Sequence, residues 1–362
     1  MRKILSLLLV LAMVLCLTAC SPAPAPLEAT PEPTATEQPT AEPTAEPTPT
    51  PIPTPIPSYY PITVTDQAGR EVTIEDEPEK LVSGYYISTS LLIALGLDDK
   101  LVGIEAKADK RAIYRLSAPA LIELPNVGTA KEFDLEGCAA LEPDLVLLPL
   151  KLKSAAETLE GLGIDVLLVN PESQELLTKM IHLVAAATNS EENAQALLGF
   201  AEEQEAFLSA ALEGAEAPRV YLAGNSSVLS TAGGAMYQSD MLGMAGGENV
   251  AGGIGDAYWA EIDYEQLLSW NPDYIVLASD AAYTAEDVLN DPNLAGCAAV
   301  ANGNVVQLPG KAEAWDSPVP SGILGSVWLA NVLHPDRVSD EECAARIDAY
   351  YEAFYHFTYS EN

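Results

Sequence analysis

Apolar and polar positions follow two different periods along this chain of 362 residues. Residues 62–74, ITVTDQAGREVTI, alternate on both sides of a glycine-containing turn, which predicts a β-hairpin. Further along, short apolar runs typical of buried strands alternate with amphipathic stretches typical of helices, which predicts an α/β fold with mostly parallel sheets. The predicted strands cover residues 81–83, 101–104, 145–150, 164–169, 219–222, 274–278 and 305–308. The predicted helices cover residues 88–96, 154–162, 172–187, 236–245, 263–270, 320–333 and 339–357.

A longer helix, predicted over residues 190–213, divides this alternation into two halves. Ser190 is a suitable N-cap, because its hydroxyl can accept a hydrogen bond from the first turn. Gly214 and Pro218 follow the last apolar positions and favour termination there. The strand and helix pattern then restarts, so we expect two α/β lobes joined by one long helix.

Two segments, about 130 residues apart, repeat one pattern without a gap. Residues 133–148 read FDLEGCAALEPDLVLL, and residues 262–277 read IDYEQLLSWNPDYIVL. Each copy predicts a short helix, a Pro-Asp pair and a buried strand. Internal repetition of this kind indicates equivalent positions in two related units, so we place one copy in each lobe.

The N-terminal region predicts export and attachment to a membrane. Residues 1–20 combine a short basic start with an apolar run too brief for a membrane span, and end in Leu17-Thr18-Ala19-Cys20. This ending resembles the bacterial lipobox, in which the cysteine is lipidated and becomes the mature N-terminus. An ordinary cleaved signal peptide is the alternative. Residues 21–59 are rich in proline and threonine, which predicts a disordered, extended stalk that reaches roughly 110 Å.

Charge and cysteine content exclude several classes of function. The net charge of −36 argues against binding of nucleic acid or of anionic lipid headgroups, because both need a basic surface. Cys138, Cys297 and Cys343 are far apart and odd in number, so they predict neither disulfides nor a zinc site. We expect them to be small buried apolar residues.

In its order of motifs the chain resembles the ABC-transporter substrate-binding proteins of the metal-chelate class, which bind ferric siderophores, cobalamin or haem. The resemblance covers residues 62–335. It rests on the hairpin, KLVSGYYISTSLLIALGLDDKLVGI, Val127-Gly128, PDLVLLP, GGENVA, PDYIVL and EAWDSPVPSGILG. It implies two Rossmann-like lobes, bridged by a rigid helix, with the ligand in the cleft between them. The expected domains are 60–189, 190–214 and 215–362.

The same resemblance implies a role for one glutamate in each copy of the repeat. In this family, a surface glutamate of each lobe docks against arginines of the membrane permease. Glu136 and Glu265 match those positions, and carboxylate–arginine pairs are geometrically selective. The alternative is that both are ordinary solvated helix residues.

Cations and aromatic residues follow the predicted strands, where ligands of open α/β sheets bind. The expected ligand contacts are Tyr85, Tyr86, Lys107, Arg111, Thr129, Lys131, Ser226, Tyr258, Trp259, Lys311 and Trp315. Cations would attract an anion and aromatic rings would cover a large chelate, which favours a ferric siderophore. Lysines also favour surface loops without any ligand. Cobalamin, haem and molybdate or tungstate remain alternatives, although Thr129 stands where haem-binding relatives place a tyrosine.

No enzymatic activity, cofactor or metal site is predicted. The chain has no G-x-S-x-G or G-x-x-x-x-G-K-[ST] motif, and His182, His334 and His356 are isolated. The expected partners are an ABC permease with its cytoplasmic ATPase, a small-molecule ligand, and a membrane reached through Cys20. We expect a monomer. A tethered surface enzyme or a wall-binding module is the alternative class.

Overall fold

The computed structural model describes residues 59–255 and 259–361. The predicted signal segment, Cys20, almost all of the stalk and Tyr258 lie outside these ranges. Among the described residues, no helix is both long enough and apolar enough to cross a lipid bilayer.

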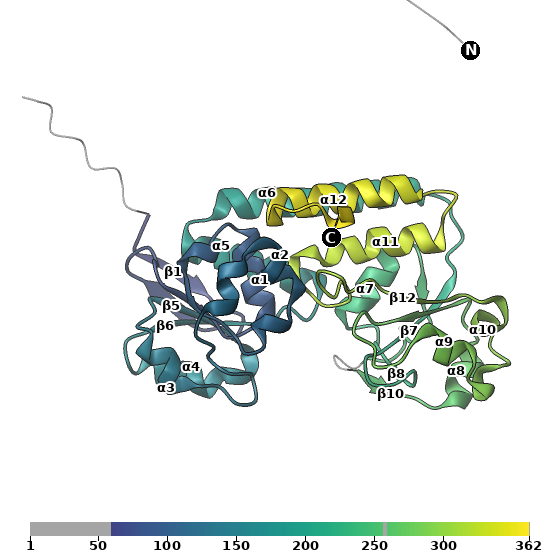
Figure 1. Cartoon of the computed structure of the whole chain (residues 1–362), viewed down its shortest axis with the longest axis horizontal. Helices are drawn as coiled ribbons and strands as arrows, with labels where there is room; N and C mark the ends of the chain where they lie inside the picture. Colours follow the sequence, from purple (N-terminus) through teal and green to yellow (C-terminus); the bar gives the residue numbers. More distant parts are fainter. Residues whose placement is uncertain (1–58, 256–258, 362) are drawn as a thin grey trace, which may run out of the picture. The chain divides into compact units, whose positions relative to one another are not determined.

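The N-terminal lobe contains a hairpin and a parallel sheet (Figure 1). The predicted hairpin is confirmed, with Ile62 paired to Ile74 in antiparallel register. The parallel sheet has the strand order β4-β3-β5-β6. The strands of this lobe are β1 Ile62–Thr65, β2 Glu71–Ile74, β3 Leu81–Ser83, β4 Leu101–Gly103, β5 Leu145–Pro149 and β6 Asp165–Val169. Its helices are α1 Tyr86–Ala94, α2 Ala112–Ser117, α3 Leu135–Ala140, α4 Lys153–Glu160 and α5 Gln174–Thr188.

Strand β5 shows why these runs are apolar at every position. Leu145 and Leu147 belong to one hydrophobic cluster, whereas Val146 and Leu148 belong to another. Since successive side chains of a strand point to opposite faces, both faces of the sheet are covered.

The C-terminal lobe contains a mixed sheet with the strand order β10-β8-β7-β11-β12, in which β9 also pairs with β7. Its central strands are parallel, as predicted, but β8 pairs antiparallel with both β7 and β10. The strands are β7 Arg219–Ala223, β8 Ser230–Thr231, β9 Glu248–Asn249, β10 Ala260–Glu261, β11 Tyr274–Leu277 and β12 Val305–Gln307. The helices around it are α7 Tyr237–Met244, α8 Tyr264–Trp270, α9 Ala285–Leu289, α10 Ala298–Asn302, α11 Ile323–Leu333 and α12 Asp340–Tyr355.

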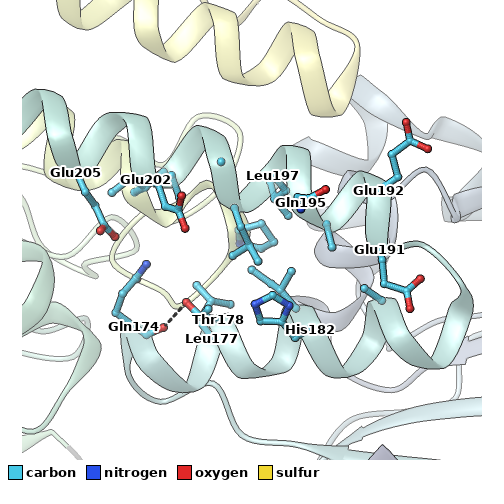
Figure 2. A pocket seen from close by; sticks show the side chains of 18 residues that line it. Gln174, Leu177, Thr178, His182, Glu191, Glu192, Gln195, Leu197, Glu202 and Glu205 are labelled. Carbon is cyan, nitrogen blue, oxygen red and sulfur yellow. Dashed lines mark hydrogen bonds between the residues drawn. The ribbon is translucent and has the colours of Figure 1, made fainter. Parts of the chain in front are cut away.

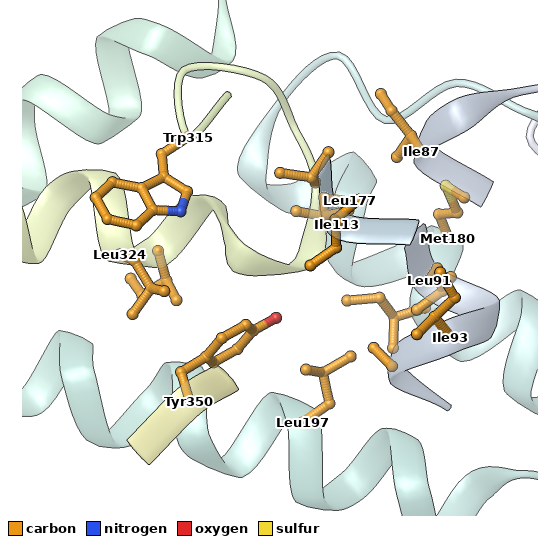
Figure 3. Close-up of a cluster of buried hydrophobic side chains, with 14 of the residues drawn as sticks. Ile87, Leu91, Ile93, Ile113, Leu177, Met180, Leu197, Trp315, Leu324 and Tyr350 are labelled. Atoms are coloured by element: carbon orange, nitrogen blue, oxygen red, sulfur yellow. The ribbon is translucent and has the colours of Figure 1, made fainter. Parts of the chain in front are cut away.

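Helix α6, Glu191–Ala211, confirms the long helix predicted between the lobes. A large hydrophobic cluster joins it to both lobes and to α11 and α12. Figure 3 shows part of this cluster, with Leu91 of α1, Leu197 of α6, Leu324 of α11 and Tyr350 of α12. Because one cluster includes side chains from both lobes, a large separation of the lobes would expose apolar surface to water.

The two copies of the repeat have the same local structure. Asp134 and Asp263 cap α3 and α8 by accepting backbone N–H groups at 2.9 and 2.8 Å. Glu142 and Asn271 follow the ends of α3 and α8 in left-handed conformations, with φ of 49° and 45°. The fold class and the equivalence of the two segments are therefore confirmed.

The Pro-Asp pairs connect neighbouring strands. Asp144 Oδ2 accepts the backbone N–H groups of Glu79 and Lys80 at 2.9 and 2.8 Å, directly before β3. Asp273 Oδ2 accepts the N–H of Arg219, at the start of β7, at 2.9 Å. Each aspartate therefore aligns its own strand with the adjacent parallel strand.

Replacing Asp144 with alanine should destabilise the N-terminal lobe. It removes two hydrogen bonds to a charged but exposed acceptor, so we expect the free energy of unfolding to fall by about 1–2 kcal/mol. Chemical denaturation followed by circular dichroism measures this change. Asp76→Ala is the matched control, since Asp76 is exposed and has no hydrogen-bond partner among the described residues. Equal stability of D144A and wild type would contradict the role of Asp144.

Candidate functional site

A cleft of about 450 Å³ lies where strands of both lobes end. Ligands of open α/β sheets bind beyond the carboxyl ends of the strands, and the residues that line this cleft follow those ends. They include Tyr86 after β3, Lys107, Lys110 and Arg111 after β4, Asn225 after β7, Asp280 after β11, and Glu313 after β12. The cleft is therefore the candidate ligand site.

Two glycines let the chain pass close to neighbouring side chains at the rim of the cleft. A Cβ atom at Gly84, after β3, would lie 2.6 Å from Leu148 Cδ2. A Cβ at Gly224, after β7, would lie 2.8 Å from the ring of Trp259. A Cβ atom at either position would require these neighbours to move, so glycine lets the chain just before Tyr86 and Asn225 pass close to them.

Arg111 is held in the cleft by a buried carboxylate and an aromatic ring. Its Nε donates to Glu105 Oε1 at 3.2 Å, and its guanidinium lies 4.1 Å from the centre of the Tyr86 ring. Glu105 is itself fixed, because Tyr114 and Thr89 each donate a hydroxyl to its carboxylate at 2.7 Å. The Nε edge of the guanidinium is therefore bonded to Glu105, and one face of it packs on the Tyr86 ring.

The other edge of this guanidinium is available. Among the described residues, no acceptor bonds to either Nη atom of Arg111, and about a third of its side chain is exposed. Arginine presents a planar fork of donors that fits carboxylate and other paired oxygen atoms. Because Glu105 and Tyr86 hold it in one orientation, Arg111 presents its two Nη atoms as preorganised donors, an arrangement suited to an anionic group.

The C-terminal lobe contributes acidic groups to the same cleft. Glu313 is almost fully buried and accepts hydroxyl hydrogen bonds from Ser90 and Ser321, both at 2.6 Å. Burial raises the pKa of this carboxyl, against opposing effects of the two serines and of Arg111. Burial likewise raises the pKa of Asp316, whose Oδ1 accepts the Ser279 N–H at 3.2 Å.

Three residues predicted from the sequence line the cleft together: Tyr86, Lys107 and Arg111. Tyr85 packs edge-on against Tyr86, with the ring centres 5.3 Å apart. Thr129 instead closes a tight turn, since its hydroxyl accepts the backbone N–H groups of Lys131 and Glu132.

The remaining predicted contacts lie elsewhere in the structure. Trp315 is fully buried and donates its indole N–H to the Tyr351 hydroxyl at 2.9 Å. The expectation that it forms a cleft wall is therefore wrong, because its ring is enclosed by the core. Lys311 donates to the carbonyl of Tyr359 at 2.9 Å. Lys131, Ser226 and Trp259 do not line the cleft either.

Sequence reasoning did not select Asp280 and Glu313 as site residues. The predicted contacts were mostly cations and aromatic residues, and acids are common on the surface of so acidic a chain. Their position in the sequence could have indicated a place in the cleft, since each acid stands a few residues after a predicted strand. Lys110, Tyr114 and Asn225 also follow predicted strands and line the cleft, but they were not among the expected ligand contacts.

A larger cavity, of about 740 Å³, lies on the helical face between α5 and α6. Figure 2 shows His182 and Gln195 in it, with Glu191, Glu202 and other carboxylates around it. It lies away from the strand ends, and no lysine or arginine occurs among the described residues that line it. It therefore suits an anionic ligand less well than the smaller cleft, which is the candidate ligand site.

Glu136 and Glu265 occupy matching exposed positions. Each lies in the first turn of its helix, α3 or α8. Neither carboxylate has a bonding partner among the residues that the structure describes. Both are therefore available to a partner protein.

Metal coordination by the protein itself finds no support in the described ranges. Within them, no group of three or more His, Cys, Asp or Glu side chains is arranged to hold a metal ion. Cys138, Cys297 and Cys343 are buried and unpaired, as predicted. Burial raises the pKa of the Cys138 and Cys343 thiols to about 11, which keeps both protonated.

The chain is similar in sequence to several binding proteins. It is 26% identical to the molybdate-binding protein MolA of Haemophilus influenzae, over 82% of this chain and 91% of that protein. It is 26% identical to the uncharacterised ABC transporter substrate-binding lipoprotein YvrC of Bacillus subtilis, over 60% and 69%. It is also 26% identical to the vitamin B12-binding protein of Yersinia pestis, over 55% and 69%.

Solved structures show the same fold. MolA with bound molybdate superposes with a TM-score of 0.73 at 25% identity, over 82% of this chain and 99% of that one. A periplasmic solute binding protein from Veillonella parvula gives 0.70 at 25% identity, over 82% and 93%. These relatives are binding proteins and not enzymes, in agreement with the sequence prediction. The family model for periplasmic binding proteins matches residues 81–312, and the chain belongs to this family.

Proposed function

We propose that this protein is a lipid-anchored receptor that captures an anionic metal chelate, with a ferric siderophore as the first candidate, and delivers it to an ABC permease. The observation that carries the proposal is Arg111, whose free edge faces a cleft between the lobes. Lys107 and Lys110 line the same wall. Lys110 also pairs with Asp109 at 2.8 Å and Arg111 with Glu105, so these acids partly offset the positive field that the three cations give this wall.

The size and surface of the cleft support a chelate. A volume of about 450 Å³ falls within the range of roughly 300–1,000 Å³ found for small-molecule sites. The ring of Tyr86 supplies an apolar surface beside the cations. A bare oxyanion would fill only a fraction of this space.

Molybdate is the second candidate, because the similarity to MolA extends over most of both chains in sequence and in structure. Cobalamin is favoured less, by the similarity to a vitamin B12-binding protein over a shorter part of the chain.

Delivery is supported by the repeated helix. A permease with two related subunits would present two similar basic pockets, and this protein presents two carboxylates in equivalent positions of two lobes. Export and anchoring are supported by the lipobox-like sequence and by the similarity to a substrate-binding lipoprotein.

Arg111→Ala should weaken ligand binding at least about tenfold, since hydrogen bonds to charged groups contribute about 1.5–3 kcal/mol. Tryptophan fluorescence titration with ferric siderophores, cobalamin, haem and molybdate measures the affinity. Lys179→Ala is the control, because Lys179 pairs with Glu175 on an exposed part of α5. If wild type responds to none of these compounds, the proposed ligand class fails; if R111A binds as tightly as wild type, Arg111 is not the anchor.

Reversing both docking charges, in the double variant Glu136→Lys/Glu265→Lys, should abolish transport and leave ligand affinity unchanged. Each lysine would face the arginines that the glutamate is proposed to contact. Uptake of labelled ligand by cells and titration of the purified protein give the two readouts. The matched control is Glu157→Lys/Glu286→Lys, which reverses one exposed glutamate in each lobe. Normal uptake with the first variant would refute docking through these residues.

Cys20→Ser should release the protein from the membrane, because serine cannot take the thioether-linked lipid. Fractionation of cells and medium, followed by immunoblotting, shows where the protein is. Cys16→Ser, four residues earlier in the same segment, should leave it in the membrane fraction. Membrane retention of C20S would show that the segment is not a lipoprotein signal.

A further inference from the structure

The charges that line the ligand cleft are separated by lobe. Of the described lining residues, the charged ones from the N-terminal lobe are all cations, namely Lys107, Lys110 and Arg111. Those from the C-terminal lobe are all acids, namely Asp280 and Glu313. A ligand held between the lobes therefore meets opposite charges on its two sides.

Glu313 can accept hydrogen bonds in addition to the two that it already accepts. Ser90, from the N-terminal lobe, donates to Oε1, and Ser321 donates to Oε2. A carboxylate offers about four lone-pair positions, so each oxygen can accept a further donor. Because the side chain is almost fully buried, a donor on the ligand would offset part of the cost of removing it from water.

Among the described residues that line the cleft, no lysine or arginine comes from the C-terminal lobe. Lys311 is near in sequence, but it bonds to the carbonyl of Tyr359 and lies over that ring. Asp280 is exposed, and its carboxylate has no partner within the described residues. Burial is the main cause of the raised pKa of the neighbouring Asp316, and the charge of Asp280 adds to it.

From this separation we infer that the ligand is dipolar: a chelate whose negatively charged oxygen atoms face Arg111 and the two lysines, and which also carries a cationic group, such as an ammonium, that contacts Asp280 and Glu313. The inference rests on the proposed function and narrows its ligand class. An entirely anionic ligand of this size would place negative charge against the exposed carboxylate of Asp280 and against the acceptor oxygen atoms of Glu313. That arrangement is unfavourable at short range in a partly desolvated site.

The two acids could instead act on the protein alone, by attracting the cations of the opposite lobe and so closing the cleft. The two roles give different results. A contact with a cationic group of the ligand affects only ligands that carry such a group. A contact that closes the lobes affects every ligand equally.

Matched ligands separate these cases. The probes are the ferric complexes of a tris-hydroxamate and of a tris-catecholate, each prepared with a free terminal amine and with that amine acetylated, together with molybdate. Affinities are measured by fluorescence titration for wild type, Asp280→Asn and Glu313→Gln. Glu216→Gln is the control, since Glu216 is exposed in the loop before β7, at the other end of that strand. Thermal unfolding checks that each variant is folded, and the exposed Asp280 provides a test even if E313Q is unstable.

In wild type and in E216Q, we expect the amine form to bind at least tenfold more tightly than the acetylated form. In D280N or E313Q the ratio should fall below about threefold, through weaker binding of the amine form alone. Equal binding of both forms to wild type, or an equal loss for both forms in the variants, would overturn the inference and leave capture of a ferric chelate intact. Binding of molybdate alone, or of none of the probes, would overturn both the inference and the proposed ligand.

Discussion

Burial of the hydrophobic cluster that includes Leu91, Leu197, Leu324 and Tyr350 is the constraint on which the rest of the structure depends. These side chains come from the N-terminal lobe, from α6 and from the two helices after the C-terminal sheet. A buried hydrogen bond adds to this contact, since the hydroxyl oxygens of Ser90 and Tyr355 lie 2.8 Å apart. Because apolar burial favours keeping these elements together, the cluster holds the lobes in contact. Ser90, in this contact region, also bonds to Glu313 of the cleft.

The ligand cleft follows from this arrangement. Parallel strands bring their following loops to one edge of each sheet, and the shared cluster holds the two edges in one region. Arg111 then depends on three further contacts, since Glu105 is fixed by Tyr114 and Thr89 before it fixes the guanidinium. The anchor is therefore supported by neighbours that do not themselves need to contact the ligand.

The two lobes are alike in backbone and unlike in charge. Asp134 and Asp263 cap equivalent helices, and Asp144 and Asp273 align equivalent strands. This similarity gives two matched surfaces, which is what docking to a symmetric partner requires. The cleft shows no such symmetry, since one wall is cationic and the other acidic. The proposed docking would therefore use the surfaces that the two lobes share, and the proposed ligand recognition would use the charges in which they differ.

The pattern of apolar and polar residues predicted the elements correctly where an element was long or buried on both faces. Helix α6 and strands β5 and β11 were predicted within a few residues, because an uninterrupted period or apolar run leaves few alternatives. The short helices α9 and α10 and the two-residue strands β8, β9 and β10 were missed, since so few residues carry no readable period. Among the site residues, Trp315 was misplaced for a related reason: a tryptophan after a strand can point toward a cleft or into the core.

By itself, the sequence determined the α/β class, the division by a long helix, the equivalence of the repeated segments and the strand ends near which a ligand must bind. These features depend on local period and on capping, which neighbouring residues specify. Only the tertiary structure decided which loop side chains meet. It brought Arg111 onto Tyr86 and Glu105, turned Lys311 toward Tyr359, and buried Glu313 at the base of the cleft. Such contacts join residues far apart in the chain, and their geometry is set by the packing of the two lobes.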